Sequence, residues 1–149
     1  MIKILLAEHD SSRIDQFLTQ LSGVRALTIA VKCAPDAVAR MTNHEFDLIV
    51  IGDSPDRWTG IYPKLYHQRG QVVVTAHDIR VPRLVRIAKP KSLYCPFCDA
   101  MTIIVRDIAA NLAAKFDATH NVQTLSINQI LCMILPSFPY LDRDGRTSA

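Results

Sequence analysis

The sequence has little glycine and cysteine, with five glycines and four cysteines in 149 residues. No apolar run reaches the ~18–20 residues of a membrane span, so we expect no membrane partner. No glycine-rich phosphate loop is present, which argues against a nucleotide-dependent enzyme. The apolar stretch before Glu8 is too short for a signal peptide, and we therefore expect a cytoplasmic protein. In that reducing compartment cysteines are more often free thiols than disulfides.

The composition is that of one folded domain. Apolar residues make up 49% of the chain and charged residues 21%, which argues against wholesale disorder. A length of 149 residues is enough to bury a core without disulfide bonds. The formal net charge of +3 is too small to indicate a class of partner by itself.

The basic residues are unevenly distributed along the chain. Residues 57–91 contain eight Lys or Arg and a single acid, Asp78. Arg80, Arg83 and Arg86 recur at every third position of this segment. We interpret it as a solvated basic face, or as an electrostatic surface for an acidic protein or a nucleic acid. Because no nucleic-acid-binding signature accompanies it, nucleic-acid binding is only an accessory alternative.

Short apolar runs alternate with amphipathic segments along most of the chain. Continuous apolar runs are typical of strands buried on both faces, and apolar spacing of i, i+3, i+4 and i+7 is typical of helices. The predicted strands are 2–7, 26–32, 47–51, 71–75 and 84–88. Helices are predicted from Ser12, as part of a capping box, to about Gly23, from Pro35 to about His44, and from about Pro96 to Lys115. This alternation predicts an α/β fold with a doubly wound, five-stranded parallel sheet.

Two prolines constrain the remaining helices. Pro63 is expected to break or delay the helix that the spacing of Trp58, Ile61 and Leu65 suggests. Between the predicted fourth and fifth strands only residues 77–83 are available for a helix, and Pro82 interrupts them. We therefore predict that the fourth helix is missing or reduced to a turn.

The predicted strand ends carry acidic, hydroxyl and lysine side chains in a defined order. They are Glu8-His9-Asp10 after the first strand, Thr75 in the fourth, and Lys89-Pro90 after the fifth. Together with the run 45–51 before Gly52, they resemble the receiver domain of two-component response regulators. The resemblance implies a phosphoryl-accepting carboxylate, an acidic pair that holds Mg²⁺, a lysine that completes the anion clamp and a hydroxyl that reports the modification.

Two of these positions lack the side chain that the resemblance requires. The acceptor position falls on Gly52, and the second acid of the metal-binding pair falls on His9, a poor ligand for Mg²⁺. Glu8, Thr75 and Lys89 remain. We therefore expect a degenerate receiver, or pseudo-receiver, which acts without phosphorylation, without enzymatic activity and without a metal or cofactor.

Asp53 is the alternative phosphoryl acceptor, one residue beyond Gly52. A step of one residue along a strand reverses the side-chain direction, so a loop or bulge would have to redirect Asp53. Because Asp53 precedes Ser54-Pro55, its simpler interpretation is a turn residue.

Cys95-Pro96-Phe97-Cys98 suggests a competing function. The sequence places this motif at the start of the last long helix, where the helix dipole and exposed N–H groups would lower the pKa of a thiol. The motif resembles a glutaredoxin active site, so a thiol-redox switch that uses Cys95 and Cys98 is an alternative. Half of a zinc site and two packed cysteines are the other interpretations.

Residues 116–149 lie beyond the receiver-like domain, which we place at 1–115. A helix with an apolar stripe is predicted at about 125–135, and the residues after Leu141 are expected to form a loose end. The helix either packs on its own domain or is offered to a second copy or another protein. The sequence thus predicts a signalling module that binds a protein partner, with a homodimer through the last helices as one form.

Overall fold

The structure, a computed structural model, describes residues 1–52, 55–77 and 80–134. The chain divides into two units, Met1–Ala114 and a second unit that begins at Lys115. The strand ends that the sequence singles out all lie in the first unit. None of the helices in the described part of the chain combines the length and apolarity that crossing a membrane requires.

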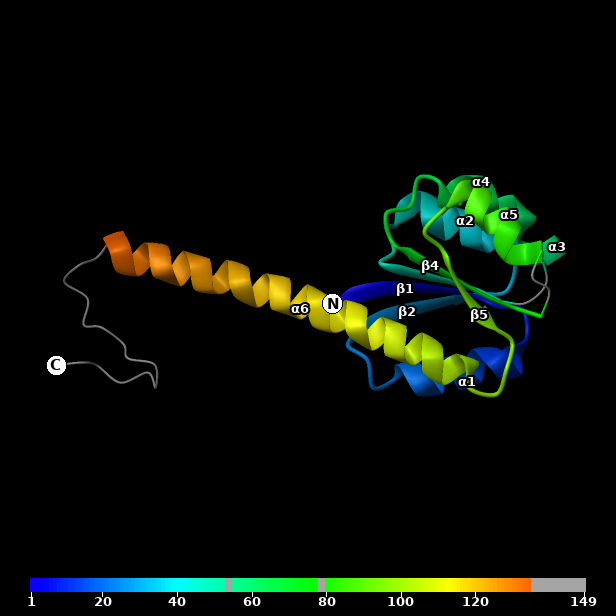
Figure 1. Cartoon of the computed structure of the whole chain (residues 1–149), viewed down its shortest axis with the longest axis horizontal. Helices are drawn as coiled ribbons and strands as arrows, with labels where there is room; N and C mark the ends of the chain where they lie inside the picture. The colour runs from blue at the N-terminus through cyan, green and yellow to red at the C-terminus, as the bar shows by residue number, and fades with distance from the viewer. Residues whose placement is uncertain (53–54, 78–79, 135–149) are drawn as a thin grey trace. The chain divides into compact units, whose positions relative to one another are not determined.

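Five parallel strands form the sheet of the first unit, in the order β2-β1-β3-β4-β5 (Figure 1). They are β1 (Ile2–Ala7), β2 (Ala26–Val31), β3 (Leu48–Ile51), β4 (Gln71–Ala76) and β5 (Leu93–Pro96). The predicted doubly wound parallel sheet is therefore confirmed. The first four strands lie within a residue of their predicted bounds. β1, β3 and β4 are largely apolar runs between polar or turn-forming residues, and β2 follows the alternation of Leu27, Ile29 and Val31.

Helices cover both faces of this sheet. The helical elements are α1 (Ser11–Leu21), α2 (Ala34–Asn43), α3 (Pro55–Trp58), η1 (Thr59–Ile61), α4 (Tyr62–Leu65), α5 (Arg80–Ala88) and α6 (Met101–Ile134). In the first unit, α1 and the start of α6 cover one face, and α2, α4 and α5 cover the other (Figure 1). Pro63 lies in the first turn of α4, and the segment between β3 and β4 consists of three short helical elements rather than one helix.

The main hydrophobic core lies on one face of the sheet, between the strands and the helices α2, η1 and α4. Strand residues such as Leu5, Ile49 and Val72 are fully buried there, together with Trp58 and Leu65. Burial of one such side chain contributes about 1.5–3 kcal/mol to folding. This packing holds β1, β3 and β4 side by side and brings their carboxyl ends to one edge.

The predicted fifth strand at 84–88 and the missing fourth helix are both wrong. These residues belong to α5, in which Val85 is buried while Arg83, Arg86 and Ile87 are exposed, the periodicity of a helix. Pro82 does not interrupt α5, because it lies in the first turn, where a helical N–H has no partner to lose. The fifth strand is β5, a short edge strand that pairs with β4 in the register Thr75 with Cys95.

The helix predicted for about 125–135 is not a separate element. α6 runs without interruption from Met101 to Ile134. The sequence between these residues contains neither glycine nor proline, so nothing ends the helix before the capping-box pattern at Ser126. The loose end predicted after Leu141 lies outside the described residues.

Candidate functional site

The candidate site lies at the carboxyl edge of the sheet, where β1, β3 and β4 end. The backbone joins two of these ends directly, because the Gly52 N–H donates to the Ala7 carbonyl at 2.7 Å. The Glu8 N–H donates to the Val31 carbonyl at 3.1 Å, which ties the same edge to β2. Ligand sites of doubly wound sheets are formed at this edge.

The Glu8 carboxylate lies against Gly52 and fills the space that a side chain there would need. Glu8 is fully buried. A Cβ added at Gly52 would overlap Glu8 Oε2 and lie 2.8 Å from Glu8 Cδ. A side chain at position 52 and the observed position of Glu8 therefore exclude each other.

Three groups surround the other carboxylate oxygen, Glu8 Oε1. The Asp10 N–H donates to it at 3.0 Å. Arg13 Nε lies 3.3 Å away as an ion-pair contact, and His9 Nδ1 also lies 3.3 Å away; neither nitrogen is aligned as a hydrogen-bond donor. Because a guanidinium is always protonated, Arg13 supplies a permanent positive charge beside Glu8.

The ring of Phe97 also contacts the Arg13 guanidinium. The guanidinium lies 4.9 Å from the ring centroid of Phe97, in cation–π geometry. Phe97 in turn stacks on His77, with centroids 3.9 Å apart. Its N–H donates to the Ala76 carbonyl at 3.2 Å, which fixes the loop after β5 against the end of β4.

Sequence reasoning missed Arg13, Phe97 and His77. Arg13 is the single basic residue of α1, and that isolation is the one signal that could have indicated it. Phe97 and His77 carry no local signal, because their contact depends on the pairing of β4 with β5.

Asp10 is the N-cap of α1 and not part of an acidic pair. Its Oδ1 accepts from the N–H groups of Ser12 at 2.9 Å and Arg13 at 3.4 Å. These backbone hydrogen bonds, that of Arg13 first, lower the pKa of the Asp10 carboxyl. The sequence predicted Ser12 as the cap, which is wrong by two residues. Asp10 is the cap because its backbone is extended, as the N-cap position requires, and its side chain accepts from the first turn.

Thr75 lies near the carboxyl end of β4, as expected, but its hydroxyl is engaged. It is fully buried and its Oγ1 donates to the Ile51 carbonyl at 3.2 Å. The hydroxyl thus ties β4 to the end of β3, next to Gly52. Asp53, the alternative acceptor, lies outside the described residues.

Lys89 does not lie at the carboxyl edge, which corrects its expected place at a strand end. It follows α5, its N–H donates to the Val85 carbonyl at 2.7 Å, and its ammonium donates to the Gln68 carbonyl. The end of β5 is instead Cys95-Pro96. The lysine of the implied anion clamp is therefore replaced by a thiol.

The cysteine motif does not begin a helix. Cys95 lies in β5 and is buried, and Cys98 is exposed ahead of α6. Burial raises the pKa of the Cys95 thiol, and the neighbouring Cys98 raises it further. This is the opposite of the activated thiolate that a helix terminus would favour. Within the described residues, no group of three or more His, Cys, Asp or Glu side chains could hold a metal ion.

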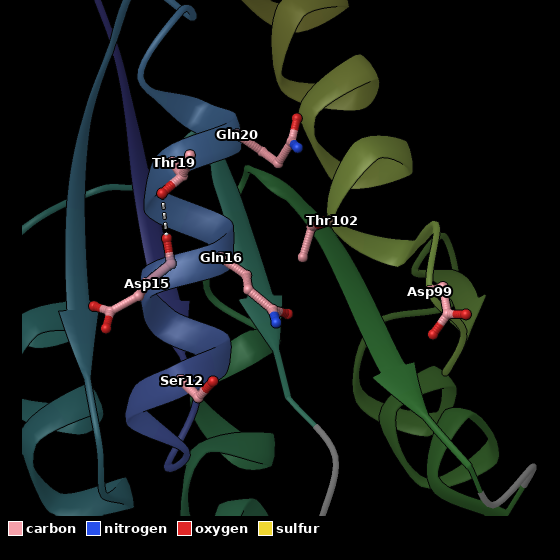
Figure 2. Close-up of a pocket in the computed structure, with 7 residues that line it drawn as sticks. All are labelled: Ser12, Asp15, Gln16, Thr19, Gln20, Asp99 and Thr102. Carbon is pink, nitrogen blue, oxygen red and sulfur yellow. Dashed lines mark hydrogen bonds between the residues drawn. The ribbon is translucent and has the colours of Figure 1, made fainter.

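A separate open cleft of about 580 Å³ lies between α1 and the start of α6 (Figure 2). It is lined by Ser12, Asp15, Gln16, Thr19, Gln20, Asp99 and Thr102. One of the lining side chains, Gln20, accepts a hydrogen bond through Oε1 from Arg106 Nη1 at 3.1 Å. The lining consists of hydroxyl, amide and carboxylate groups and includes neither Glu8 nor Gly52.

Comparisons with known proteins support the fold. No family model and no curated protein sequence matches the chain. A CheY-like response regulator receiver domain protein from Methanospirillum hungatei JF-1 superposes with a TM-score of 0.64 at 15% identity, over 79% of this chain and 98% of that chain. Other matching structures are also receiver domains. The receiver resemblance is thereby confirmed at the level of the fold.

Two further structures show how far this similarity extends. A fusion of the yeast Spc42 trimeric coiled coil to another structure has a TM-score of 0.64 at 14% identity, over 91% of this chain and 95% of that chain. A de novo designed Rossmann 2x3 protein has a TM-score of 0.57 at 16% identity, over 72% and 85%. Because a designed protein matches too, the shared fold by itself carries no function.

Gly52→Ala is expected to destabilise the protein by about 1–3 kcal/mol, because the added methyl overlaps the buried Glu8 carboxylate. Urea unfolding measures this cost. Gly23→Ala is the matched control, since no atom lies within 4 Å of a Cβ at Gly23. Combined with Glu8→Ala, Gly52→Ala should cost less than the sum of the single changes. Glu8→Gln keeps the size of the side chain, so its destabilisation and that of Gly52→Ala should simply add in the double variant. If the double variants with Glu8→Ala and with Glu8→Gln are equally additive, the overlap is contradicted.

Asp10 should stabilise the protein at neutral pH and lose this effect in acid. Because the folded state lowers the pKa of Asp10, its contribution is complete above the unfolded value of 3.8 and is lost as pH falls through the lower folded value. Asp10→Asn keeps a capping oxygen but cannot titrate. The stability difference between wild type and Asp10→Asn should therefore shrink as pH falls below 3.8. Urea unfolding at a series of pH values measures this difference in unfolding free energy. A difference that does not change with pH would contradict the stabilising role of the ionised Asp10 carboxylate.

Proposed function

We propose that the protein is a pseudo-receiver, which takes part in signalling by binding another protein and is not phosphorylated. The observation that carries the proposal is the Glu8 carboxylate in the space beside Gly52. A receiver needs a carboxylate side chain at that position to accept the phosphoryl group. Here the position has no side chain, and a neighbouring residue fills its space.

The charges around Glu8 support the same proposal. Phosphoryl transfer needs a hard cation held by several oxygen ligands, which neutralises the developing charge. In this chain His9 stands where the second acid would be, and Arg13 lies 3.3 Å from Glu8 Oε1. The negative charge of Glu8 is thus balanced by a side chain of the protein itself. We accordingly propose neither an enzymatic activity nor a metal or cofactor for this site.

A cytoplasmic location accompanies this proposal. The free thiols of Cys95 and Cys98, three residues apart, suit a reducing compartment. The thiol-redox alternative is less well supported, because the pKa of the Cys95 thiol is raised by burial. A phosphoryl acceptor at Asp53 remains the main alternative, and the next experiment distinguishes it.

Incubation with Mg²⁺ and a small phosphodonor such as acetyl phosphate should add no phosphoryl group to the chain. Intact-mass spectrometry measures the adduct, and the cyanobacterial phytochrome response regulator whose phosphorylated structure shares this fold serves as a positive control when treated in parallel. A stoichiometric adduct on the wild type would overturn the proposal. If that adduct disappears in Asp53→Asn, the displaced acceptor is the correct alternative.

The proposed partners include a second copy of the chain, bound through the carboxyl-terminal part of α6. The sequence places Ile127, Ile130, Leu131 and Ile134 at helical spacing, and such an apolar stripe is seldom left in water. A homodimer is the simplest such assembly.

The full chain is therefore expected to sediment at twice its monomer mass in a concentration-dependent way. The combined change of Ile127, Ile130 and Ile134 to Ser should shift it to the monomer, because each substitution removes apolar surface from the stripe. Asn128→Ser with Gln129→Ser is the control and should leave the mass unchanged. A wild-type monomer at all concentrations in analytical ultracentrifugation would contradict the homodimer.

A further inference from the structure

One surface of the first unit combines exposed apolar and exposed basic side chains. On α5, Arg83, Arg86 and Ile87 stand at i, i+3 and i+4 and are exposed, whereas Val85 is buried. Ile87 is 81% exposed, the highest value among the large apolar side chains described. α4 packs against α5, and Tyr66 at its carboxyl end is 73% exposed (Figure 1). We call this set the α5 surface: Tyr66, Arg83, Arg86, Ile87 and Lys91.

The positive charge of the α5 surface is not balanced within its own elements. Neither α4 nor α5 contains an acidic residue. Among the described residues, Arg83 and Arg86 take part in none of the ion pairs. Exposed like charges repel one another, so carboxylates of a partner would lower the free energy of this surface.

A shallow hollow adjoins the end of α5. It measures about 290 Å³ and is lined by Tyr66, Ala88, Lys89, Pro90 and Lys91. Because the Lys89 ammonium donates to the Gln68 carbonyl, that side chain is held as part of the wall. Ala88 and Pro90 contribute apolar surface, and Lys91 contributes a cation that forms no ion pair with any residue of the described part of the chain. This combination suits an apolar side chain that has carboxylates beside it.

These features favour a protein segment over a lipid surface or a nucleic acid. A bilayer surface has no projecting side chain to fill a hollow, and a nucleic acid has no aliphatic side chain to contact Ile87. Protein interfaces are enriched in Tyr and Arg, and their binding energy is concentrated where a side chain enters a pocket that excludes water.

We propose that the α5 surface binds an acidic, amphipathic segment of a partner protein. An apolar residue of that segment enters the hollow beside Tyr66, and its carboxylates pair with Arg83, Arg86 and Lys91. The inference rests on the proposed function, because it names the surface and the chemical class of the partner through which a pseudo-receiver would act.

The probe for this surface is a fluorescent synthetic helix with glutamates around a row of leucines. We expect saturable binding to the full chain in fluorescence anisotropy, and NMR shifts confined to Tyr66 and residues 83–91. A scrambled peptide of the same composition, whose leucines do not share a face, should bind about tenfold more weakly. The affinity should fall as salt is added, because exposed charges are screened.

Two variants separate the apolar and the charged contributions. Ile87→Ser, and the pair Arg83→Glu with Arg86→Glu, should each weaken binding about tenfold or more. All three side chains are exposed, so the thermal unfolding midpoint should stay at the wild-type value. Leu27→Ser and Arg40→Glu change an exposed apolar and an exposed basic residue elsewhere and should leave the affinity unchanged.

Several results would overturn the inference. They are no binding of the acidic helix, equal binding of the scrambled peptide, and tighter binding of a DNA duplex or of phosphatidylserine vesicles that the α5 variants abolish. The phosphodonor experiment does not involve α5, so the two proposals fail separately. If the chain gains no phosphoryl group and does not bind the peptide, the inference about the α5 surface is wrong and the pseudo-receiver proposal still stands.

Discussion

A carboxylate removed from water needs a compensating charge, and Glu8 imposes this requirement on the carboxyl edge of the sheet. Glu8 is fully buried, and Arg13 and the Asp10 N–H both face its Oε1. Removing one partner of a buried ion pair costs about 3–5 kcal/mol, so the start of α1 is bound to the end of β1 by electrostatics as well as by its cap. Through Phe97 the same guanidinium also reaches the loop after β5.

A single contact explains why position 52 is a glycine and why the Glu8 side chain can be buried beside it. The carboxylate of Glu8 lies where the first side-chain atom of residue 52 would be, so Glu8 can occupy this position only because residue 52 is glycine. At the edge where a receiver would hold a metal and a phosphoryl group, this chain has an ion pair between Arg13 and the buried Glu8, which is the basis of the proposed pseudo-receiver role. The proposed partner therefore binds the outer surface of the first unit through its shape and charge.

Charge is concentrated on that outer surface. α5 presents arginines and Ile87 to solvent, and Lys89 is directed toward the carbonyl of Gln68 instead of the sheet edge. A lysine placed this way cannot act as an anion clamp at the end of β5, but it can form a fixed wall of a surface hollow. The proposed interaction with an acidic segment follows from this placement.

The sequence by itself determined the parallel sheet, its first four strands and the lack of a side chain at position 52, because each is expressed in a local run of residues. The sequence did not determine that 84–88 is helical, that β5 begins at Leu93, or that α6 is continuous, since short apolar runs fit a helix or a strand equally well. Only the tertiary structure decided the contacts of Glu8 with Gly52 and of Arg13 with Phe97. The physical reason is that these contacts join side chains from different strands and helices, and their distances are set by strand pairing and core packing rather than by neighbours in the chain.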